Sequence, residues 1–275
     1  MTTSVDEPCD GGHAASGDPE ILVMPGSHAV AGTAAKILAE GIAAAVERRG
    51  RADVATTGGS TPHGVYRALV AAPLAGRVPW HGLHVWLGDD RFVPRADPLS
   101  NMRAIDAVLL GQDGHPAMLS PGNVHPWPTD GTFDVVGGPL AGPTACAAAH
   151  EVEMRAALPI DAQGRPVFDV VLVGVGADAH VLSLFPGSPA IDATGWTAAL
   201  AAPTHVAPHV RRVTCTPCVL CATPRLVVVV TGASKAAMVA HVLGADRDVH
   251  ALPAQLARRA GATWILDEEA AAALP

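Results

Sequence analysis

The sequence predicts an α/β fold, with a single doubly wound and mostly parallel sheet that carries helices on both faces. One observation is that short β-branched runs alternate with Ala-rich stretches from Ile21 to the end of the 275-residue chain. Another is that two of the runs, residues 170–173 and 227–230, are apolar at every position. Such strands are covered on both sides, as in a parallel sheet between layers of helices. The alternation therefore favours one α/β domain over residues 20–275.

The elements of the first half follow from periodicity and from stop signals. Residues 29–49 are rich in Ala and Leu, end in arginines and stop at Gly50, as a helix does. The Ala-rich residues 144–158 end at Pro159, which cannot continue a helix. In order, we expect a strand at 21–24, a helix at 29–49, a strand at 53–57, a helix ending at 69, a strand at 83–87 and helices at 100–110 and 144–158.

The second half repeats the pattern. We expect strands at 168–173, 212–216, 226–231 and 263–266, and helices at 234–243 and 251–259. The Pro- and Gly-rich residues 111–128 and 137–143 are expected to form surface loops. Residues 1–19 are rich in Gly, Ser, Asp and Ala without periodicity, which indicates a disordered N-terminal arm.

Composition and charge narrow the class of protein. Hydrophobic residues make up 49% of the chain and charged residues 16%, so a sizeable core can be buried. The N-terminus lacks the basic and apolar regions of a secretory signal, and the apolar runs look strand-sized rather than membrane-spanning. We therefore expect a cytoplasmic protein, and a monomer is favoured. A net charge of -8 disfavours nucleic acid and anionic membrane as partners.

Ligands of doubly wound sheets bind beyond the carboxyl ends of the strands, so the loops that follow strands are where chemistry is expected. The first such loop, residues 57–62, reads Thr-Gly-Gly-Ser-Thr-Pro. Gly58 and Gly59 let the backbone approach a ligand closely, and Ser60 begins a helix whose free N–H groups attract anions. A plain strand-to-helix turn explains the loop about equally well, and without a following Lys it is not a Walker loop.

The second loop, residues 88–94, reads Gly-Asp-Asp-Arg-Phe-Val-Pro. Asp89 and Arg91 stand just past a predicted strand, and a guanidinium can clamp a phosphate with two parallel hydrogen bonds. A solvated surface ion pair is the ordinary alternative for such charges.

The third loop, residues 174–187, places Asp178 and His180 directly after the most apolar strand. A His with a nearby carboxylate can act as a general base near neutral pH, although an isolated His more often caps a helix or packs. The loop also fits the G-x-G-x-x-A dinucleotide pattern. Pro186 and Pro189 exclude that interpretation because they interrupt the long helix that the pattern requires.

Two further loops offer cations at strand ends. Arg212 opens a predicted strand, and Lys235 follows another in the sequence Thr-Gly-Ala-Ser-Lys. Each of these residues taken alone is more typical of a solvated surface.

A run of cysteines raises the possibility of a metal site. Cys215, Cys218 and Cys221 are spaced C-x-x-C-x-x-C, downstream of His205 and His209. The spacing is not one of the standard iron–sulfur runs and Cys is commonly buried, so structural packing is favoured and metal is the alternative. The odd total of five cysteines also disfavours a disulfide framework.

Taken in this order, the five loops resemble the 6-phosphogluconolactonase family from about residue 21 to the C-terminus. The resemblance implies the fold shared with glucosamine-6-phosphate deaminase and ribose-5-phosphate isomerase. It implies hydrolysis of 6-phospho-D-glucono-1,5-lactone in the pentose phosphate pathway, without a metal or organic cofactor. His180 matches the family's catalytic His, here the general base, and Asp178 matches the acid that orients it.

The resemblance also implies which residues bind the phosphorylated sugar lactone. They comprise the glycine-rich phosphate loop, its basic partner, the ends of the family's Asp-Glu-Arg motif and a Lys of less certain role, namely Gly58, Gly59, Ser60, Arg212, Asp89, Arg91 and Lys235.

The chain departs from the family pattern at three positions. Asp90 replaces the usual Glu, Ala179 stands where the family has Gly, and Val181 stands where Thr is common. If position 179 has a positive φ, Ala there costs roughly 1 kcal/mol or more. The alternatives to lactone hydrolysis are therefore a non-catalytic sugar-phosphate-binding homologue, or a deaminase or isomerase of the same fold.

Overall fold

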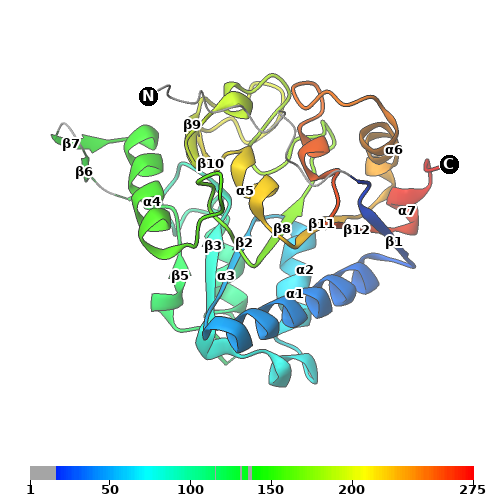
Figure 1. Ribbon diagram of the computed structural model, residues 1–275, viewed down its shortest axis with the longest axis horizontal. Coiled ribbons are helices and arrows are strands. Elements are labelled where there is room, and N and C mark those ends of the chain that lie inside the picture. The colour runs from blue at the N-terminus through cyan, green and yellow to red at the C-terminus, as the bar shows by residue number, and fades with distance from the viewer. Residues whose placement is uncertain (1–16, 115, 131, 136–137) are drawn as a thin grey trace.

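The computed structural model describes residues 17–114, 116–130, 132–135 and 138–275. A seven-stranded sheet forms its centre, and every neighbouring pair of strands is parallel (Figure 1). In spatial order the strands are β1 (Glu20–Met24), β12 (Ala262–Asp267), β11 (Leu226–Val230), β8 (Val170–Gly174), β2 (Ala52–Thr56), β3 (Leu83–Leu87) and β5 (Val124–His125). The predicted α/β class and parallel sheet are confirmed. The inner strands β8 and β11 are buried along almost their whole length, as their unbroken apolar runs require.

Helices cover both faces of this sheet. The long helix α1 packs beside α2 on one face, and α4, α5 and α6 lie on the other side (Figure 1). The helices are α1 (Ser27–Arg49), α2 (Ser60–Leu69), α3 (Met102–Val108), α4 (Pro143–Ala157), α5 (Pro217–Ala222), α6 (Ala236–Gly244) and α7 (Glu268–Ala271). The 3-10 helices are η1 (Leu74–Arg77), η2 (Trp80–Gly82), η3 (Pro121–Asn123), η4 (Pro189–Asp192), η5 (Ala233–Lys235) and η6 (Pro253–Ala257).

Helix α1 ends as predicted, because Gly50 adopts a left-handed conformation and donates its N–H to Val46 O. The expectation that no apolar stretch is long enough to span a membrane is wrong for this helix by length and composition alone. Half of its most apolar window is buried inside the fold, however, as in the core helix of a soluble protein. Of the N-terminal arm expected at residues 1–19, residues 1–16 lie outside the described residues.

One predicted strand belongs to a different sheet. β10 (Arg212–Cys215) pairs antiparallel with β4 (Asp89–Arg91) on one side and with β9 (Thr197–Leu200) on the other. In this register Arg212 lies opposite Arg91 and Thr214 opposite Asp89. The small sheet therefore joins two loops that are more than a hundred residues apart in the sequence.

Three other predictions need correction. The helix expected at 251–259 is only the 3-10 segment η6, because Leu252 is non-helical and the buried Gln255 bonds Asp246 O and Asp248 N. The loop expected at 137–143 contains β7 (Gly138–Ala141), which pairs antiparallel with β6 (Thr132–Val135). The loop expected at 111–128 contains η3 and the short edge strand β5. Helix α5 was missed within the cysteine run because its six residues show too little periodicity.

Candidate active site

A cavity of about 300 Å³ opens at the carboxyl ends of β2, β8 and β11. All five loops singled out in the sequence contribute to its walls. The predicted site residues that line it are Gly58, Gly59, Ser60, Asp89, Arg91, His180, Arg212 and Lys235. Asp178 does not line the cavity but stands behind His180, which is the position of an orienting residue.

The His180 side chain is held by the tight turn that follows β8. Its Nδ1 lies 2.5 Å from Asp178 Oδ1, and its backbone carbonyl accepts a hydrogen bond of 2.9 Å from Gly176 N. A Cβ at position 176 would lie 2.0 Å from His180 Nδ1, so only glycine fits there. The short contact to a carboxylate favours the tautomer with a proton on Nδ1, which leaves Nε2 unprotonated and able to accept one.

Asp178 is held in its ionised form by its surroundings. Burial alone would raise its pKa, but hydrogen bonds and charge interactions with His180, together with a hydrogen bond of 2.9 Å from His205 Nε2, outweigh burial and hold the pKa of Asp178 well below its usual value. An ionised Asp178 can accept the Nδ1–H of His180 and orient its ring.

The unusual Ala179 has a left-handed backbone, with a φ of 64°. This is the conformation for which the family's glycine is suited, and Ala in it costs about 1 kcal/mol. The turn forms nevertheless, and Ala179 O accepts a hydrogen bond of 2.8 Å from Ala254 N. Val181 is fully buried, so an apolar side chain fills the place where the family commonly has Thr.

The glycine-rich loop is shaped for a backbone-bound anion. A Cβ on Gly58 would lie 2.0 Å from Asn101 Oδ1, and Gly59 has a φ of 107°, so both positions require glycine. Helix α2 begins at Ser60 without a side-chain cap on its first N–H groups. The free N–H groups and the positive end of the helix face the same cavity and can bind an anion there.

Two guanidinium groups complete the cationic side of the cavity. Arg212 is only 3% exposed and donates to Pro208 O at 3.0 Å, while Arg91 donates to Asn101 Oδ1 at 2.5 Å and to Leu99 O at 3.1 Å. Both Nε atoms are buried without a hydrogen-bond partner. Burial and the nearby charge of Arg91 lower the pKa of Arg212. Two adjacent cations that line the cavity, with no ion pair to a carboxylate among the described residues, are the arrangement that an anionic ligand would complete.

Asp89 acts as a junction between the loops. Its Oδ1 accepts from Thr57 Oγ1 at 2.6 Å, and its Oδ2 accepts from Ser183 Oγ at 2.7 Å. Asn101 Nδ2 donates to its backbone carbonyl at 2.9 Å. Asp89 lines the cavity, but its carboxylate also fixes three loops relative to one another.

The adjacent Asp90 faces away into the protein. It accepts hydrogen bonds from Ser100 Oγ and Asn101 N, and burial raises its pKa to about 7. Asp90 therefore supports the conformation of the Arg91 loop rather than lining the cavity.

The Lys235 ammonium group closes the cavity on the side of β11. It lies at the end of η5 and donates to Val175 O at 3.0 Å. Burial lowers its pKa, which the negative charge of Asp178 partly opposes. It is thus held next to the loop that carries Asp178 and His180.

The cysteine run and its upstream histidines do not come together. Cys215 lies on β10, and Cys218 and Cys221 lie on α5, all buried in the apolar interior. Among the described residues no group of three or more His, Cys, Asp or Glu side chains is placed to hold a metal ion. His205 contacts Asp178 instead, and His209 Nδ1 lies 2.7 Å from Pro203 O.

Sequence reasoning missed several residues of the site. Thr57 and Ser183 anchor Asp89, the Phe185 ring packs against His180 with centroids 4.7 Å apart, and His205 holds Asp178. Thr57, Ser183 and Phe185 lie within loops that were already singled out. His205 was considered only as a possible metal ligand, because it belongs to a segment without periodicity.

Comparisons with known proteins show which family this chain resembles. The family model described as glucosamine-6-phosphate isomerases/6-phosphogluconolactonase matches residues 25–265. A 6-phosphogluconolactonase of Streptomyces coelicolor is 33% identical over 94% of this chain and 96% of its own length, and one of Mycobacterium tuberculosis is 34% identical over 93% and 98%. A solved structure of the enzyme from Trypanosoma brucei has a TM-score of 0.77 at 25% identity and covers 94% of this chain and all of its own.

A monomeric glucosamine-6-phosphate deaminase also shares the fold, with a TM-score of 0.72 at 17% identity over 92% of this chain and 99% of its own. The match of the family model over most of the chain and the relatives above 30% identity settle the assignment. The chain belongs to the family of glucosamine-6-phosphate isomerases and 6-phosphogluconolactonases.

Proposed function

We propose that this chain hydrolyses 6-phospho-D-glucono-1,5-lactone to 6-phosphogluconate, with His180 as the general base. The observation that carries the proposal is the contact of 2.5 Å between His180 Nδ1 and Asp178 Oδ1, beside a cavity that His180, Arg91 and Arg212 line together. A base and an anion site in one cavity suit a substrate that has a hydrolysable carbonyl and a phosphate.

The substrate phosphate is bound by the N–H groups at residues 58–60 and by the guanidinium of Arg212, with Arg91 beside it. This places the lactone ring toward the end of β8, where His180 lies. The binding energy of the phosphate thus serves to position the carbonyl for attack.

In the chemical step, His180 Nε2 takes a proton from a water molecule while the oxygen of that water bonds to the lactone carbonyl carbon. The bond between this carbon and the ring oxygen then breaks, and the imidazolium returns the proton to the leaving oxygen. The negative charge of Asp178 stabilises the imidazolium between these steps. The products are the free hydroxyl and the carboxylic acid, which ionises. Proton transfer of this kind contributes ~100- to 10,000-fold to the rate.

This chemistry needs neither a metal nor an organic cofactor, because the lactone is already an activated ester. We further propose that the protein acts in the cytoplasm as a monomer, within the pentose phosphate pathway. Its acidic charge of -8 makes the local cluster of cations important for capturing a phosphorylated substrate.

The decisive experiment compares the wild type with His180→Asn on freshly prepared lactone, with the rate of spontaneous hydrolysis subtracted. We expect kcat to fall by ~100-fold or more, because the base is lost. His241→Asn, at an exposed position on α6, is the matched control and should retain the full rate. An unchanged kcat in folded His180→Asn would refute the role of His180. Ammonia release from glucosamine 6-phosphate, tested in parallel, would point to a deaminase.

A further inference from the structure

His205 reaches the catalytic loop from a separate segment of the chain. We infer that His205 is a positioning residue, which fixes the Asp178 carboxylate for His180 and ties segment 201–211 to the wall of the cavity. The inference rests on the proposed function for its catalytic consequence, whereas its geometry stands on the contacts alone.

The Asp178 carboxylate is shared between two imidazoles. Oδ1 lies 2.5 Å from His180 Nδ1, and Oδ2 lies 2.9 Å from His205 Nε2. A carboxylate held at one oxygen can still rotate about its χ2 bond, which is a soft torsion. Held at both oxygens, it keeps its plane, and with it the direction of the hydrogen bond to His180. His205 thus orients the Asp178 carboxylate, as Asp178 in turn orients the His180 ring.

The segment that carries His205 also forms part of the cavity. Residues 201–211 contain neither helix nor strand, and Val206 and Ala207, which directly follow His205, line the cavity. The Phe185 ring lies edge-on to the His205 ring, with centroids 5.7 Å apart, and the same ring also packs against His180, with centroids 4.7 Å apart. His205, Phe185 and His180 are therefore in contact as one unit.

A second contact connects the same segment to the anion site. Pro208 O accepts a hydrogen bond of 3.0 Å from Arg212 Nη2. Residues 205–208 thus run from the catalytic Asp178 to the guanidinium proposed to bind phosphate. Because the His205 side chain is 48% exposed, its replacement should alter this link without opening a hole in the core.

The kinetic test compares His205→Ala, His205→Gln and the matched control His209→Gln in the full-length protein. Loss of a hydrogen bond to a charged group should lower kcat for the lactone roughly 10-fold in His205→Ala, with a smaller change in KM. Gln can donate from nearly the same position as Nε2, so His205→Gln should recover most of the rate. His209→Gln removes a His from the same segment without touching Asp178 and should keep the rate of the wild type.

A spectroscopic test makes the result independent of catalysis. In proton–nitrogen NMR of the imidazoles, the Nδ1–H signal of His180, identified by its loss in His180→Asn, reports the bond to Asp178. We expect this signal to persist in His205→Gln and His209→Gln and to broaden in His205→Ala. If the wild type fails to accelerate lactone hydrolysis, the proposed function is wrong, and this signal still decides the role of His205.

The inference is overturned if His205→Ala keeps both the His180 signal and the kcat of the wild type. It is also overturned if kcat falls as much in His205→Gln as in His205→Ala. The inference requires that Gln, which can donate a hydrogen bond to Asp178 from nearly the same position, restores most of the rate. Should His205→Ala fail to fold, His205→Asn takes its place, because Asn is polar but too short to reach Asp178 Oδ2.

Discussion

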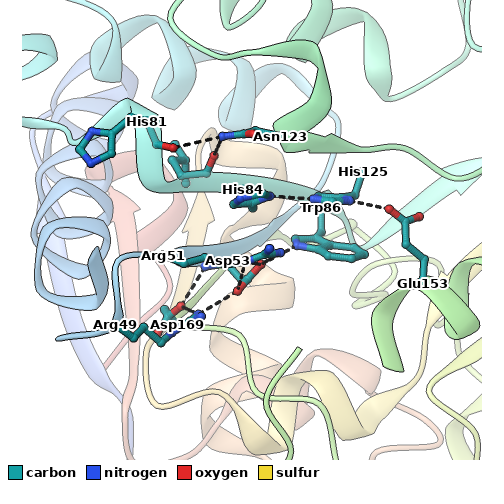
Figure 2. A network of polar contacts seen from close by, with 11 residues as sticks. Arg49, Arg51, Asp53, His81, His84, Trp86, Asn123, His125, Glu153 and Asp169 are labelled. Carbon is teal, nitrogen blue, oxygen red and sulfur yellow. Dashed lines mark hydrogen bonds and ion pairs between the residues drawn. The ribbon is translucent and has the colours of Figure 1, made fainter. Parts of the chain in front are cut away.

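The two ends of the parallel sheet differ in how their arginine side chains are paired. At the amino end of β2, the fully buried Asp53 accepts hydrogen bonds from Arg49, Arg51 and the Trp86 indole, as Figure 2 shows. Arg49 also pairs with Asp169, whose carboxylate accepts the backbone N–H of Asp53 (Figure 2). In this network every cation has a carboxylate partner, so no external ion is needed.

At the carboxyl end the cations lack such partners. Within the described part of the chain, Arg91 and Arg212 donate to neutral oxygens of Asn101, Leu99 and Pro208, and no carboxylate forms an ion pair with either of them. Buried charges in native proteins are normally paired. We conclude from this difference that buried cations paired with carboxylates have a structural role, whereas buried cations without a carboxylate partner beside a cavity indicate a ligand site.

The largest effect is expected at the amino end, for Asp53→Ala. The substitution leaves the Trp86 N–H unpaired and removes the carboxylate between Arg49 and Arg51. Removing one partner of a buried ion pair costs about 3–5 kcal/mol, measured as the free energy of unfolding in urea. The remaining folded protein should keep its kcat, because Asp53 is remote from the cavity lining.

Arg48→Ala is the matched control for Asp53→Ala. Arg48 pairs with Asp169 in the same network, but its side chain is 66% exposed. Surface ion pairs of this kind contribute about 0–1 kcal/mol, so a small loss is expected. If Arg48→Ala and Asp53→Ala lowered the free energy of unfolding equally, the burial of Asp53 would not explain how the amino-end network stabilises the fold.

The complementary substitution at the carboxyl end is Arg212→Met. If Arg212 binds the substrate phosphate as proposed, the substitution removes a charge-assisted contact, and the expected result is a rise in KM of ~10- to 100-fold. The free energy of unfolding should stay within about 1 kcal/mol of the wild type or increase, because the buried guanidinium has no carboxylate partner to lose. Kinetics and urea unfolding on the same preparation measure both quantities.

Arg211→Met is the neighbouring control for Arg212→Met. Arg211 is exposed and lies over the Phe92 ring, with its guanidinium carbon 5.4 Å from the ring centroid. Its loss should leave KM nearly unchanged. A destabilisation of Arg212→Met comparable to that of Asp53→Ala would remove the contrast between the two ends.

A third expectation concerns His150, which contacts the Trp86 and Trp127 rings near the amino-end network. Burial lowers its pKa to about 4, and neither ring nitrogen has a hydrogen-bond partner. Below pH ~6.5 the imidazole of the unfolded chain binds a proton, whereas the buried imidazole of the folded protein stays neutral. The free energy of unfolding therefore decreases as the pH is lowered. The free energy of unfolding should drop by about 2 kcal/mol between pH 7 and pH 5 from this residue.

His150→Phe tests this assignment, because Phe keeps the ring but does not titrate. Between pH 7 and pH 5, the free energy of unfolding of His150→Phe should drop by about 2 kcal/mol less than that of the wild type. Equal pH dependence in the wild type and in the variant would show that other groups cause the loss of stability in acid.

The sequence allowed the prediction of features that depend on neighbours along the chain. The apolar runs of β8 and β11, the stop of α1 at Gly50 and the pairing of Asp178 with His180 are local, and all four were expected. Their signals lie within a few residues of one another, where periodicity and loop chemistry operate.

Features that depend on distant contacts could not be predicted. The strand β4 has the sequence Asp-Asp-Arg, which reads as a loop until β10 pairs with it. The use of Asp89 as a junction requires Ser183 to be brought next to it, and the link from His205 to Asp178 spans residues of an irregular segment. Tertiary packing decides such contacts, and no local pattern encodes them.

The smallest effect is expected for Ala179→Gly, which tests whether Ala179 impairs the loop proposed to carry the general base. At a φ of 64° Gly is relaxed, so the substitution should change the free energy of unfolding by about 1 kcal/mol or less, in the stabilising direction. Since the contact of His180 with Asp178 already forms beside Ala179, we expect kcat to change less than about threefold.

Ala190→Gly is the control for Ala179→Gly, because Ala190 is similarly buried but its φ is not positive. There Gly should destabilise the protein by roughly 0.5–1 kcal/mol. A large gain in kcat for Ala179→Gly alone would instead favour the alternative of a sugar-phosphate-binding homologue with impaired catalysis. In that case the carboxyl end would still be a ligand site, because the unpaired cations of Arg91 and Arg212 are independent of position 179, but it would have lost its reaction.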